Sequence, residues 1–541
     1  MNTCTSCPKE FKITDSDRKY YERLAVPEPT LCPDCRSQRR IINTNHINLY
    51  KRKCDATGKE IISVYHEDSP LKVYDMEYFH SDKYDASEHG RDYDFNRPFF
   101  EQFEELANEV ARPSLVRGYQ FDENSDYTNY AGKNKNCYMI FDSDNNWDCY
   151  YSYGITNNKN CMDCYRVSDC ELSYECVDVA GSYGLYYSQD CGNCSESAFL
   201  KNCIGCKQCF MCSNLKNKQY YIYNVESTKE EYERLMKSLS QRDELERLLP
   251  HWEEFKLKYP QKYMHGFQNE NVSGDYLVNC KNAEDSYDCF RLWDCKYMTR
   301  SVDAKDCMDV DEGVDGIELN YESAVTVYNS NNCKFCVLVL TDCNDLEYSI
   351  YCNYSSFCFG CFGLQRKKHC ILNKQYSEEE YEELVPKIIE HMKSTGEYGE
   401  FFPMTMADFG YNESVAMDWF PLTKEEALEK GLKWRDPDKK EYLEATVKID
   451  DENICDGILA CDSCKRNYKI VEQEAKLYKQ FGIPVPSKCF YCRNQSRFDM
   501  RNSHLLHNRK CDKCNVDIQT TYSEEMPHIV YCEPCYQESL E

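Results

Sequence analysis

Cysteines spaced in multiples of three occupy the middle of this chain, and they restrict its fold more than any other feature. All twelve cysteines between positions 137 and 212 share one remainder on division by three, and nine of the eleven between 280 and 370 also share one. Cys333 and Cys336 are the exceptions. An α-helix has 3.6 residues per turn, so a strict period of three over about 75 residues would not stay on one helix face. The pattern therefore argues against helices in these two tracts.

Asn or Asp stands directly before fourteen of these 23 cysteines, as in Asn136-Cys137 and Asp148-Cys149. Both residue types tolerate a left-handed backbone and hydrogen-bond to their own main chain, so they suit corners between short strands. A cysteine just after each corner would point inward and stack in a narrow core. Short strand-and-corner units that cannot bury a face alone are typical of a β-solenoid. We predict two Tyr-rich solenoid tracts, and recurring steps of 6 and 12 indicate coils built from multiples of six.

A metal cluster inside the tracts is the main alternative to this thiol core. The run Cys203-x-x-Cys206-x-x-Cys209-x-x-Cys212 superficially resembles the ligand run of an iron–sulfur protein. That run normally has a three-residue last gap followed by Pro, whereas Ser213 follows here. The four cysteines also keep the triplet phase of their neighbours. We therefore favour a ladder of buried thiols over an iron–sulfur cluster or extra zinc between coils.

Acidic residues of the tracts raise two further interpretations. Asp142-Ser-Asp-Asn-Asn146 and Asp309-Val-Asp311 offer oxygen ligands for calcium, but both lack the loop Gly and the closing Glu of a calcium-binding loop. We favour turn-capping acids. For a carbohydrate-active solenoid, no pair of carboxylates stands out from the corner acids. The case for any enzyme is thin, because the sequence contains no P-loop, nucleophile elbow, His-Glu-x-x-His motif or dinucleotide fingerprint.

Cys-x-x-Cys pairs gather near both termini, and the two ends superimpose without a gap at an offset of 457 positions. Each pair places two thiolates on one side of a tight turn, and two pairs supply the four ligands of a closed tetrahedral zinc site. Such a site has no open position for a substrate, so we expect structural Zn²⁺, about three ions per chain. The predicted ligands are Cys4, Cys7, Cys32 and Cys35; Cys461, Cys464, Cys489 and Cys492; and Cys511, Cys514, Cys532 and Cys535.

A fourth set of positions has lost its ligands. At the offset of 457, Cys54 corresponds to Cys511, but the other three positions hold Thr57, Asp75 and Tyr78. One thiolate cannot hold a structural zinc ion, so we predict a degenerate, metal-free module there.

Basic residues lie beside the predicted zinc sites. Arginines next to a zinc module are compatible with phosphate contacts to RNA or DNA. The alternative is that they pair with the acids of the chain itself, whose formal net charge is −28. The sequence favours this second interpretation and leaves nucleic acid as the alternative function. The candidate contacts are Arg36, Arg39, Arg40, Arg493, Arg497 and Arg501.

Composition indicates where such a chain works. No apolar run approaches the roughly 18 residues of a membrane span, and the first ten residues have no secretory h-region, so we expect no membrane contact. Thirty-seven cysteines without a signal favour a reducing compartment over a secreted, disulfide-bonded protein. We expect a cytoplasmic structural or interaction protein that docks another protein.

The domain organisation follows from these patterns. We expect a mainly β chain in which two cysteine-rich solenoids alternate with helices and are flanked by duplicated zinc modules. Capping residues Thr228 and Ser377 predict a helix after each solenoid, and Pro386 should kink or restart the second one. The expected segments are 1–83 (zinc ribbon plus degenerate ribbon), 84–126 (helical linker), 127–220 (first solenoid), 221–271 (helical), 272–376 (second solenoid), 377–457 (helical or irregular linker) and 458–541 (tandem zinc ribbons).

Residues 3–40 resemble the probable zinc-ribbon module of small bacterial proteins, in which two Cys-x-x-Cys pairs surround a Tyr-Tyr helix and an Arg follows the second pair. The whole chain further resembles large uncharacterised cysteine-rich zinc-ribbon proteins of candidate-phyla bacteria. Matching stretches include Arg52-Lys53-Cys54, Asp94–Phe100 and Val530–Tyr536. The resemblance implies zinc at the positions named above and brings no established activity.

Overall fold

Two long parallel β-ladders form the body of the computed structural model, which describes residues 1–436, 442–451 and 453–540. In the first ladder Tyr150 pairs with Tyr138, twelve residues earlier, and the same offset recurs along the ladder. Most coils of this solenoid are therefore twelve residues long, and the predicted β-solenoid is confirmed. The first solenoid contains β7 (Arg117–Gly118), β8 (Thr128–Gly132), β9 (Tyr138–Asp144), β10 (Tyr150–Tyr153), β11 (Tyr165–Ser168), β12 (Val177–Ala180), β13 (Tyr183–Tyr186), β14 (Gln189–Gly192), β15 (Ser195–Lys201), β16 (Phe210–Ser213), β17 (Tyr221–Ile222) and β18 (Val225–Glu226).

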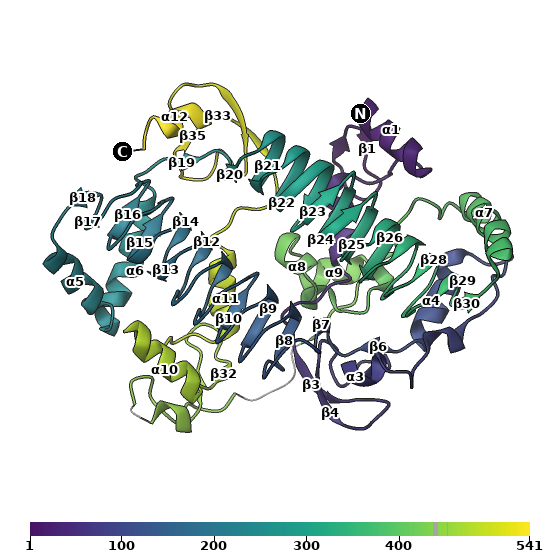
Figure 1. The fold of residues 1–541 in the computed structure, drawn as a ribbon, viewed down its shortest axis with the longest axis horizontal. Helices are drawn as coiled ribbons and strands as arrows, with labels where there is room; N and C mark the ends of the chain where they lie inside the picture. The colour runs from purple at the N-terminus through teal and green to yellow at the C-terminus, as the bar shows by residue number, and fades with distance from the viewer. Residues whose placement is uncertain (437–441, 452, 541) are drawn as a thin grey trace.

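The second solenoid repeats this architecture and lies beside the first, as Figure 1 shows. It contains β20 (Gly266–Phe267), β21 (Glu270–Val278), β22 (Lys281–Thr299), β23 (Val302–Lys305), β24 (Met308–Glu318), β25 (Tyr321–Val327), β26 (Asn331–Val339), β27 (Asn344–Glu347), β28 (Ser356–Phe359), β29 (Lys368–Ile371) and β30 (Lys374–Gln375).

Left-handed backbone marks every third residue of the coils. Asn136, Met139, Asp142 and Asn145 all have φ between 52° and 57°, so a coil of twelve residues has four corners. A left-handed conformation costs a non-glycine residue about 1–2 kcal/mol. Side-chain ladders offset part of this cost: Nδ2 of Asn136 donates to Oδ1 of Asp148, one coil further on, at 3.1 Å. The predicted role of Asn and Asp as corner residues is confirmed.

The cysteines of the first tract fill the interior of the coils. All twelve are buried, and their thiols donate to backbone carbonyl oxygens; Sγ of Cys203, for example, lies 3.4 Å from the oxygen of Lys201. Burial raises the pKa of Cys161 and of Cys164 well above the usual value, so these thiols stay neutral. All 37 cysteines lie in the described part of the chain, and none of them forms a disulfide.

The two cysteines outside the triplet phase lie where coils of the second solenoid have thirteen residues. Tyr321 pairs with Met308, and Lys334 pairs with Tyr321, thirteen residues apart each time. The pairing of Asn344 with Asn331 adds a third such step. Three coils of thirteen residues add three residues in all, which is the length of one side of a coil. From Cys343 onward the cysteines therefore share the remainder of the earlier ones again.

Helices follow both solenoids. Thr228 caps α5 (Lys229–Ser238), and Ser377 forms a capping box at α7 (Glu378–Thr395), as predicted. The predicted restart at Pro386 is wrong, because α7 continues through this residue, whereas the predicted kink stays a prediction. No helix in the described ranges is long and apolar enough to cross a membrane. The other elements between the terminal modules are η1 (Ala86–His89), α4 (Phe99–Glu109), β6 (Arg112–Pro113), α6 (Arg242–Lys256), β19 (Gln261–Lys262), η2 (Met404–Met406), η3 (Tyr411–Glu413), α8 (Ala416–Trp419), α9 (Lys424–Glu429) and η4 (Ile454–Asp456).

Four small modules, two at each end, complete the molecule; we call them N1 (1–44), N2 (50–79), C1 (459–502) and C2 (507–537). N1 contains β1 (Asn2–Thr3), β2 (Glu10–Phe11), α1 (Asp15–Leu24) and α2 (Pro33–Ile41), and N2 contains β3 (Tyr50–Lys53), β4 (Glu60–Ser63), β5 (Val73–Tyr74) and α3 (Met76–Phe79). C1 contains β31 (Leu459–Ala460), β32 (Asn467–Tyr468), α10 (Glu472–Phe481) and α11 (Phe490–Phe498), and C2 contains β33 (His507–Lys510), β34 (Asp517–Thr520), β35 (Val530–Tyr531) and α12 (Glu533–Gln537).

Each pair of modules contacts one solenoid and the strand directly before the other. Helix α2 of N1 packs on β24 of the second solenoid, whereas β5 of N2 pairs with β6, directly before the first. At the other end, α11 of C1 packs on β10 of the first solenoid, and β35 of C2 pairs with β19, directly before the second. The two pairs therefore bridge the solenoids crosswise, and in Figure 1 N1 and α10 lie on opposite sides of the molecule.

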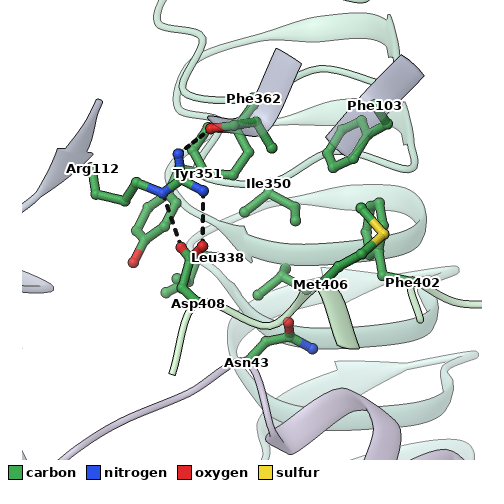
Figure 2. A pocket seen from close by; sticks show the side chains of 12 residues that line it. Asn43, Phe103, Arg112, Leu338, Ile350, Tyr351, Phe362, Phe402, Met406 and Asp408 are labelled. Carbon is green, nitrogen blue, oxygen red and sulfur yellow. Dashed lines mark hydrogen bonds and ion pairs between the residues drawn. The ribbon is translucent and has the colours of Figure 1, made fainter. Parts of the chain in front are cut away.

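A buried ion pair closes the joint between the end of the second solenoid and the segment before the first. Arg112 makes a two-pronged contact with Asp408 at 2.8 and 3.0 Å, and its guanidinium lies 4.3 Å from the ring centre of Phe362 (Figure 2). The cavity beside it measures about 30 Å³, room for one or two water molecules. This joint is packed too tightly to hold a ligand.

Candidate metal centres

The structure brings together the four sulfur atoms of each predicted cysteine set. Within each set, all four Sγ atoms lie within 4.8 Å of one another. Four thiolates at 2.3 Å from a tetrahedral zinc ion are about 3.8 Å apart, so the spacing fits zinc. The Sγ–Sγ distances are 3.7 Å for Cys7–Cys32, 3.8 Å for Cys461–Cys492, 3.7 Å for Cys464–Cys489 and 3.6 Å for Cys514–Cys532.

The chain positions the two halves of each set in different ways. The first Cys-x-x-Cys pair lies in a tight turn, where the amide of Cys4 donates to the carbonyl of Lys9 at 3.0 Å. The second pair lies at a helix start: Cys32 is the N-cap of α2, and Cys35 lies in its first turn. Amide groups and the helix dipole at this end favour thiolates. Cys489 and Cys532 cap α11 and α12 in the same way.

Hydrogen bonds already favour ionised sulfur at one or two positions of each set. The Cys35 thiol beside Cys32 lowers the pKa of Cys32 to about 5. Burial opposes ionisation of Cys461, but amides of Cys464 and Cys489 lower its pKa to about 6. The equivalent Cys511 has the same pKa of about 6 for the same reasons. A metal ion would therefore meet sites that are partly deprotonated near neutral pH.

Module N2 keeps the backbone of a zinc module around different side chains. Asp75 takes the N-cap position of α3, where its carboxylate accepts from the amide of Tyr78 at 2.8 Å and from the hydroxyl of Thr57 at 3.3 Å. The amide of Asp75 donates to Sγ of Cys54 at 3.3 Å. The amide of Cys532 donates to Sγ of Cys511 in C2 at the same distance. Side-chain hydrogen bonds thus join the two halves of N2.

The arginines of α2 point into the second solenoid. Nε of Arg36 lies 3.0 Å from Oδ1 of Asp309, and Nε of Arg40 lies 2.7 Å from Oδ2 of Asp311. Arg40 also reaches Glu322 at 3.3 Å. All five side chains are at most 2% exposed. Asp309 and Asp311, which the sequence analysis interpreted as turn-capping acids, hold arginines instead.

Module C1 repeats this contact on the first solenoid. Asp163, which is fully buried, accepts from Nε of Arg493 at 2.9 Å and lies 3.0 Å from Nη1 of Arg497. Glu175 pairs with Arg497 at 3.0 Å, although burial raises the pKa of Glu175 to about 7. The remaining pairs are Arg501 with Asp178 and Asp288, and Arg39 with Glu322 and Glu400.

In the structure the six candidate arginines pair with the acids of the chain itself, the interpretation that the sequence favours. Their side chains are at most 10% exposed, and their guanidinium groups share hydrogen bonds with buried carboxylates. Nucleic-acid binding through these residues stays a prediction. The six residues are Arg36, Arg39, Arg40, Arg493, Arg497 and Arg501.

Sequence reasoning missed the acidic partners of these arginines. Asp163 and Glu175 lie one coil apart on the first solenoid, 322 to 334 positions before Arg497, so no local pattern links them. One signal was available. Arg36 and Arg40 are one helical turn apart, as are Arg493 and Arg497, and this spacing marks one helix face that a docking surface would cover.

Comparison with known proteins bears on the N-terminal module. A family model described as a probable treble clef domain matches residues 1–44. A ribbon carries both ligand pairs on hairpins, whereas N1 carries one pair at a turn and the other at a helix start, so the treble clef corrects the expected zinc ribbon. Comparison with curated proteins finds no match to the chain. The family match covers N1 alone and supports zinc binding there.

Proposed function

We propose that this chain is a zinc-binding scaffold whose terminal modules lock two β-solenoids into one body that docks a partner protein. The observation that carries the proposal is the burial of arginines from N1 and C1 among solenoid carboxylates. Such a contact is costly unless the geometry is held, because the charges must leave water. A zinc ion that fixes the start of α2 or α11 would hold it.

In this proposal zinc is structural and holds the helices that carry the buried arginines. We expect three ions per chain, one in each of N1, C1 and C2, each bound by four thiolates with no open coordination position. Cys32 and Arg36 are one helical turn apart on α2, so the ion anchors the helix directly beside its buried arginine. Loss of the ion would release that anchor and leave three carboxylates of the second solenoid without their partners.

A docking surface is suggested by a pattern that occurs on both solenoids. Trp147 and Trp293 lie 146 positions apart and are 50% and 41% exposed. Trp147 pairs with Lys135 and Lys159 on the two neighbouring coils, and Trp293 pairs with Lys305. The hydrogen bond from Asn282 to Asp294 places Lys281 beside Trp293 on the coil before it. The lysines pair outward with glutamates, so each tryptophan is an apolar centre with a charged rim, which is the composition of a protein interface. The tryptophan ladders are Glu123, Lys135, Trp147, Lys159 and Glu171, and Glu270, Lys281, Trp293, Lys305 and Glu318.

The locking role is tested by zinc removal from the full chain. Chelation should release about three zinc ions and enlarge the radius of gyration measured by small-angle X-ray scattering, while the β-sheet circular dichroism of the solenoids persists. An unchanged radius of gyration after complete metal loss would contradict the locking role.

The docking role is tested separately with a Trp147→Ser, Trp293→Ser double variant. Proteins that co-purify with the chain from its native cells should be lost from this variant and retained by Phe357→Ser, which alters an equally exposed aromatic residue of the second solenoid. Equal retention by both variants would remove the tryptophan ladders as the docking surface.

A further inference from the structure

An apolar ladder runs along one outward side of the second solenoid, where each of the strands β20 to β25 contributes one residue (Figure 1). Each member follows an inward residue and precedes a left-handed corner, as Val302 does between the buried Ser301 and Asp303. Strand pairing places successive members on successive coils. The apolar ladder consists of Phe267, Val278, Phe290, Val302, Val314 and Val327.

The apolar ladder is open to solvent. Phe267 is 63% exposed, and the other five side chains are partly exposed. Within the described chain, four members pack against none of the buried clusters, namely Val278, Phe290, Val302 and Val314. Scattered apolar residues are normal on a protein surface, whereas a contiguous row of them marks an interaction site.

The coil itself does not require apolar residues on this side. The equivalent side of the first solenoid, which also precedes the tryptophan ladder, pairs with the same regular offset of twelve residues. Valine favours strands, but these coils form largely without it. The side chains there are Asp144, Thr156, Ser168, Ala180 and Gly192, with Ile204 at the far end.

Acidic corners border the apolar ladder. Asp303, Asp315 and Asp342 occupy the corner that follows this side of the coil. Asp303 pairs with Arg291, whereas Asp315 and Asp342 make no ion pair with any described residue. Asp342 accepts a long hydrogen bond of 3.4 Å from Asn329. Desolvation and the neighbouring Asp303 raise the pKa of Asp315, so a cation placed beside this carboxylate would relieve the repulsion.

The size of the apolar ladder selects between kinds of partner. Five steps of about 4.8 Å between coils span about 24 Å, and one side of three residues is about 10 Å wide. The area of about 240 Å² is well below the roughly 800 Å² per partner of a stable interface, so the ladder alone does not hold a second copy of this chain. A helix of about 16 residues has this length and a diameter of about 10 Å.

The spacing of the coils also suits a helix. Helical turns are about 5.4 Å apart and the coils about 4.8 Å, so each turn meets about one coil and buries one apolar side chain against it. Such helices are recognised through apolar residues at i, i+3 or i+4 and i+7. Basic residues on the flank of the helix would complement Asp315 and Asp342.

We propose that the apolar ladder binds an amphipathic helix of a partner protein, with apolar side chains on Val302 and Val314 and basic residues beside Asp315 and Asp342. The proposal goes beyond the scaffold role, because it states the chemistry of the partner. It does not depend on the tryptophan ladders, since Trp293 lies on the next side of the coil.

The test is fluorescence anisotropy of the full zinc-loaded chain with a labelled probe peptide of about 18 residues. This Lys peptide has Leu at every third or fourth position, Lys on one flank of the helix, and Ala and Gln elsewhere. A second peptide, the Glu peptide, has Glu in place of each Lys. We expect the Lys peptide to bind at least tenfold more tightly than the Glu peptide, and its Kd to rise with salt, because salt screens the attraction.

Matched variants assign the binding to the apolar ladder. Val302→Thr with Val314→Thr keeps the shape and the strand preference of both side chains, and it should weaken binding of the Lys peptide about tenfold. Asp315→Asn keeps a residue that tolerates the left-handed corner and should weaken binding about threefold. The Trp147→Ser, Trp293→Ser double variant should bind the Lys peptide like the unaltered chain.

Four outcomes would overturn the proposal. The first three are no binding of the Lys peptide, equal binding by the valine variant and the unaltered chain, and equal binding of the Lys and Glu peptides. Loss of binding in the tryptophan variant is the fourth, because it would place the peptide on the tryptophan ladders. Sedimentation velocity completes the test: a dimer that the valine variant abolishes would show that a second copy covers the ladder instead.

Discussion

Asp163→Asn removes the charge at the centre of the contact between C1 and the first solenoid and leaves the shape of the side chain unchanged. Asp163 is fully buried and lies 2.9 and 3.0 Å from the guanidinium groups of Arg493 and Arg497. After the substitution Arg493 has no ion pair with a described residue, and Arg497 keeps only Glu175. Breaking a buried ion pair in this way costs about 3–5 kcal/mol.

The assay is amide hydrogen exchange of α11, read against the amides of β10. A loss of about 3–5 kcal/mol in docking free energy raises the exchange rate of α11 by about 10² to 4 × 10³-fold, since every 1.4 kcal/mol is a factor of ten. The matched control is Asp169→Asn, an exposed corner on the same solenoid that accepts a hydrogen bond from Asn157. If α11 stays equally protected in both variants, the ion pairs do not hold C1 in place.

Four further substitutions test the modules and the coils. Burial raises the pKa of Glu474 to about 7. The protonated carboxyl therefore contributes its full stability below the unfolded pKa of about 4.5, and this contribution is lost as the pH rises through 7. Glu474→Gln should make the free energy of unfolding, measured in urea, less dependent on pH between 5 and 8. Cys489→Ser with Cys492→Ser should lower the zinc content by one ion per chain and expose α11 to protease. Asp75→Ala should leave the zinc content unchanged. Mass spectrometry measures the zinc content of both variants and the protease fragments of the first. Cys209→Leu should overfill the coil core and lower the free energy of unfolding by about 1–3 kcal/mol in urea titration. Iron content and absorbance near 400 nm should be the same as in the unaltered chain, because Cys209 is interpreted as a core thiol and not as a cluster ligand.

The solenoids could be predicted from the sequence because their information is local. Asn136 and Cys137 lie side by side in the chain, and the corner and the core that they specify are formed by those same residues. The position of the thirteen-residue coils could also be located in the sequence, since Cys333 and Cys336 leave the triplet phase. The sequence did not show that the cause is one added residue per coil.

Tertiary contacts limited the rest of the prediction. The basic residues of α2 and α11 were recognisable, but the carboxylates that bury them lie about 270 to 330 positions away. Helix α7 overrides the expected break at Pro386, because Ile388 and Met392 beyond it are buried in the core of the molecule. Packing of this kind outweighs the roughly 3 kcal/mol that an internal proline costs a helix.

The placement of the modules fixes the order in which their contacts can form during synthesis. Asp309 is made 273 residues after Arg36, which at about 5–20 residues per second takes roughly 14 to 55 s. The ion pair between them cannot form before then. C1, by contrast, leaves the ribosome when its solenoid is already complete. N1 therefore exists with unpaired arginines for about half of the time that the chain is being made, which suits a module that zinc can fold by itself.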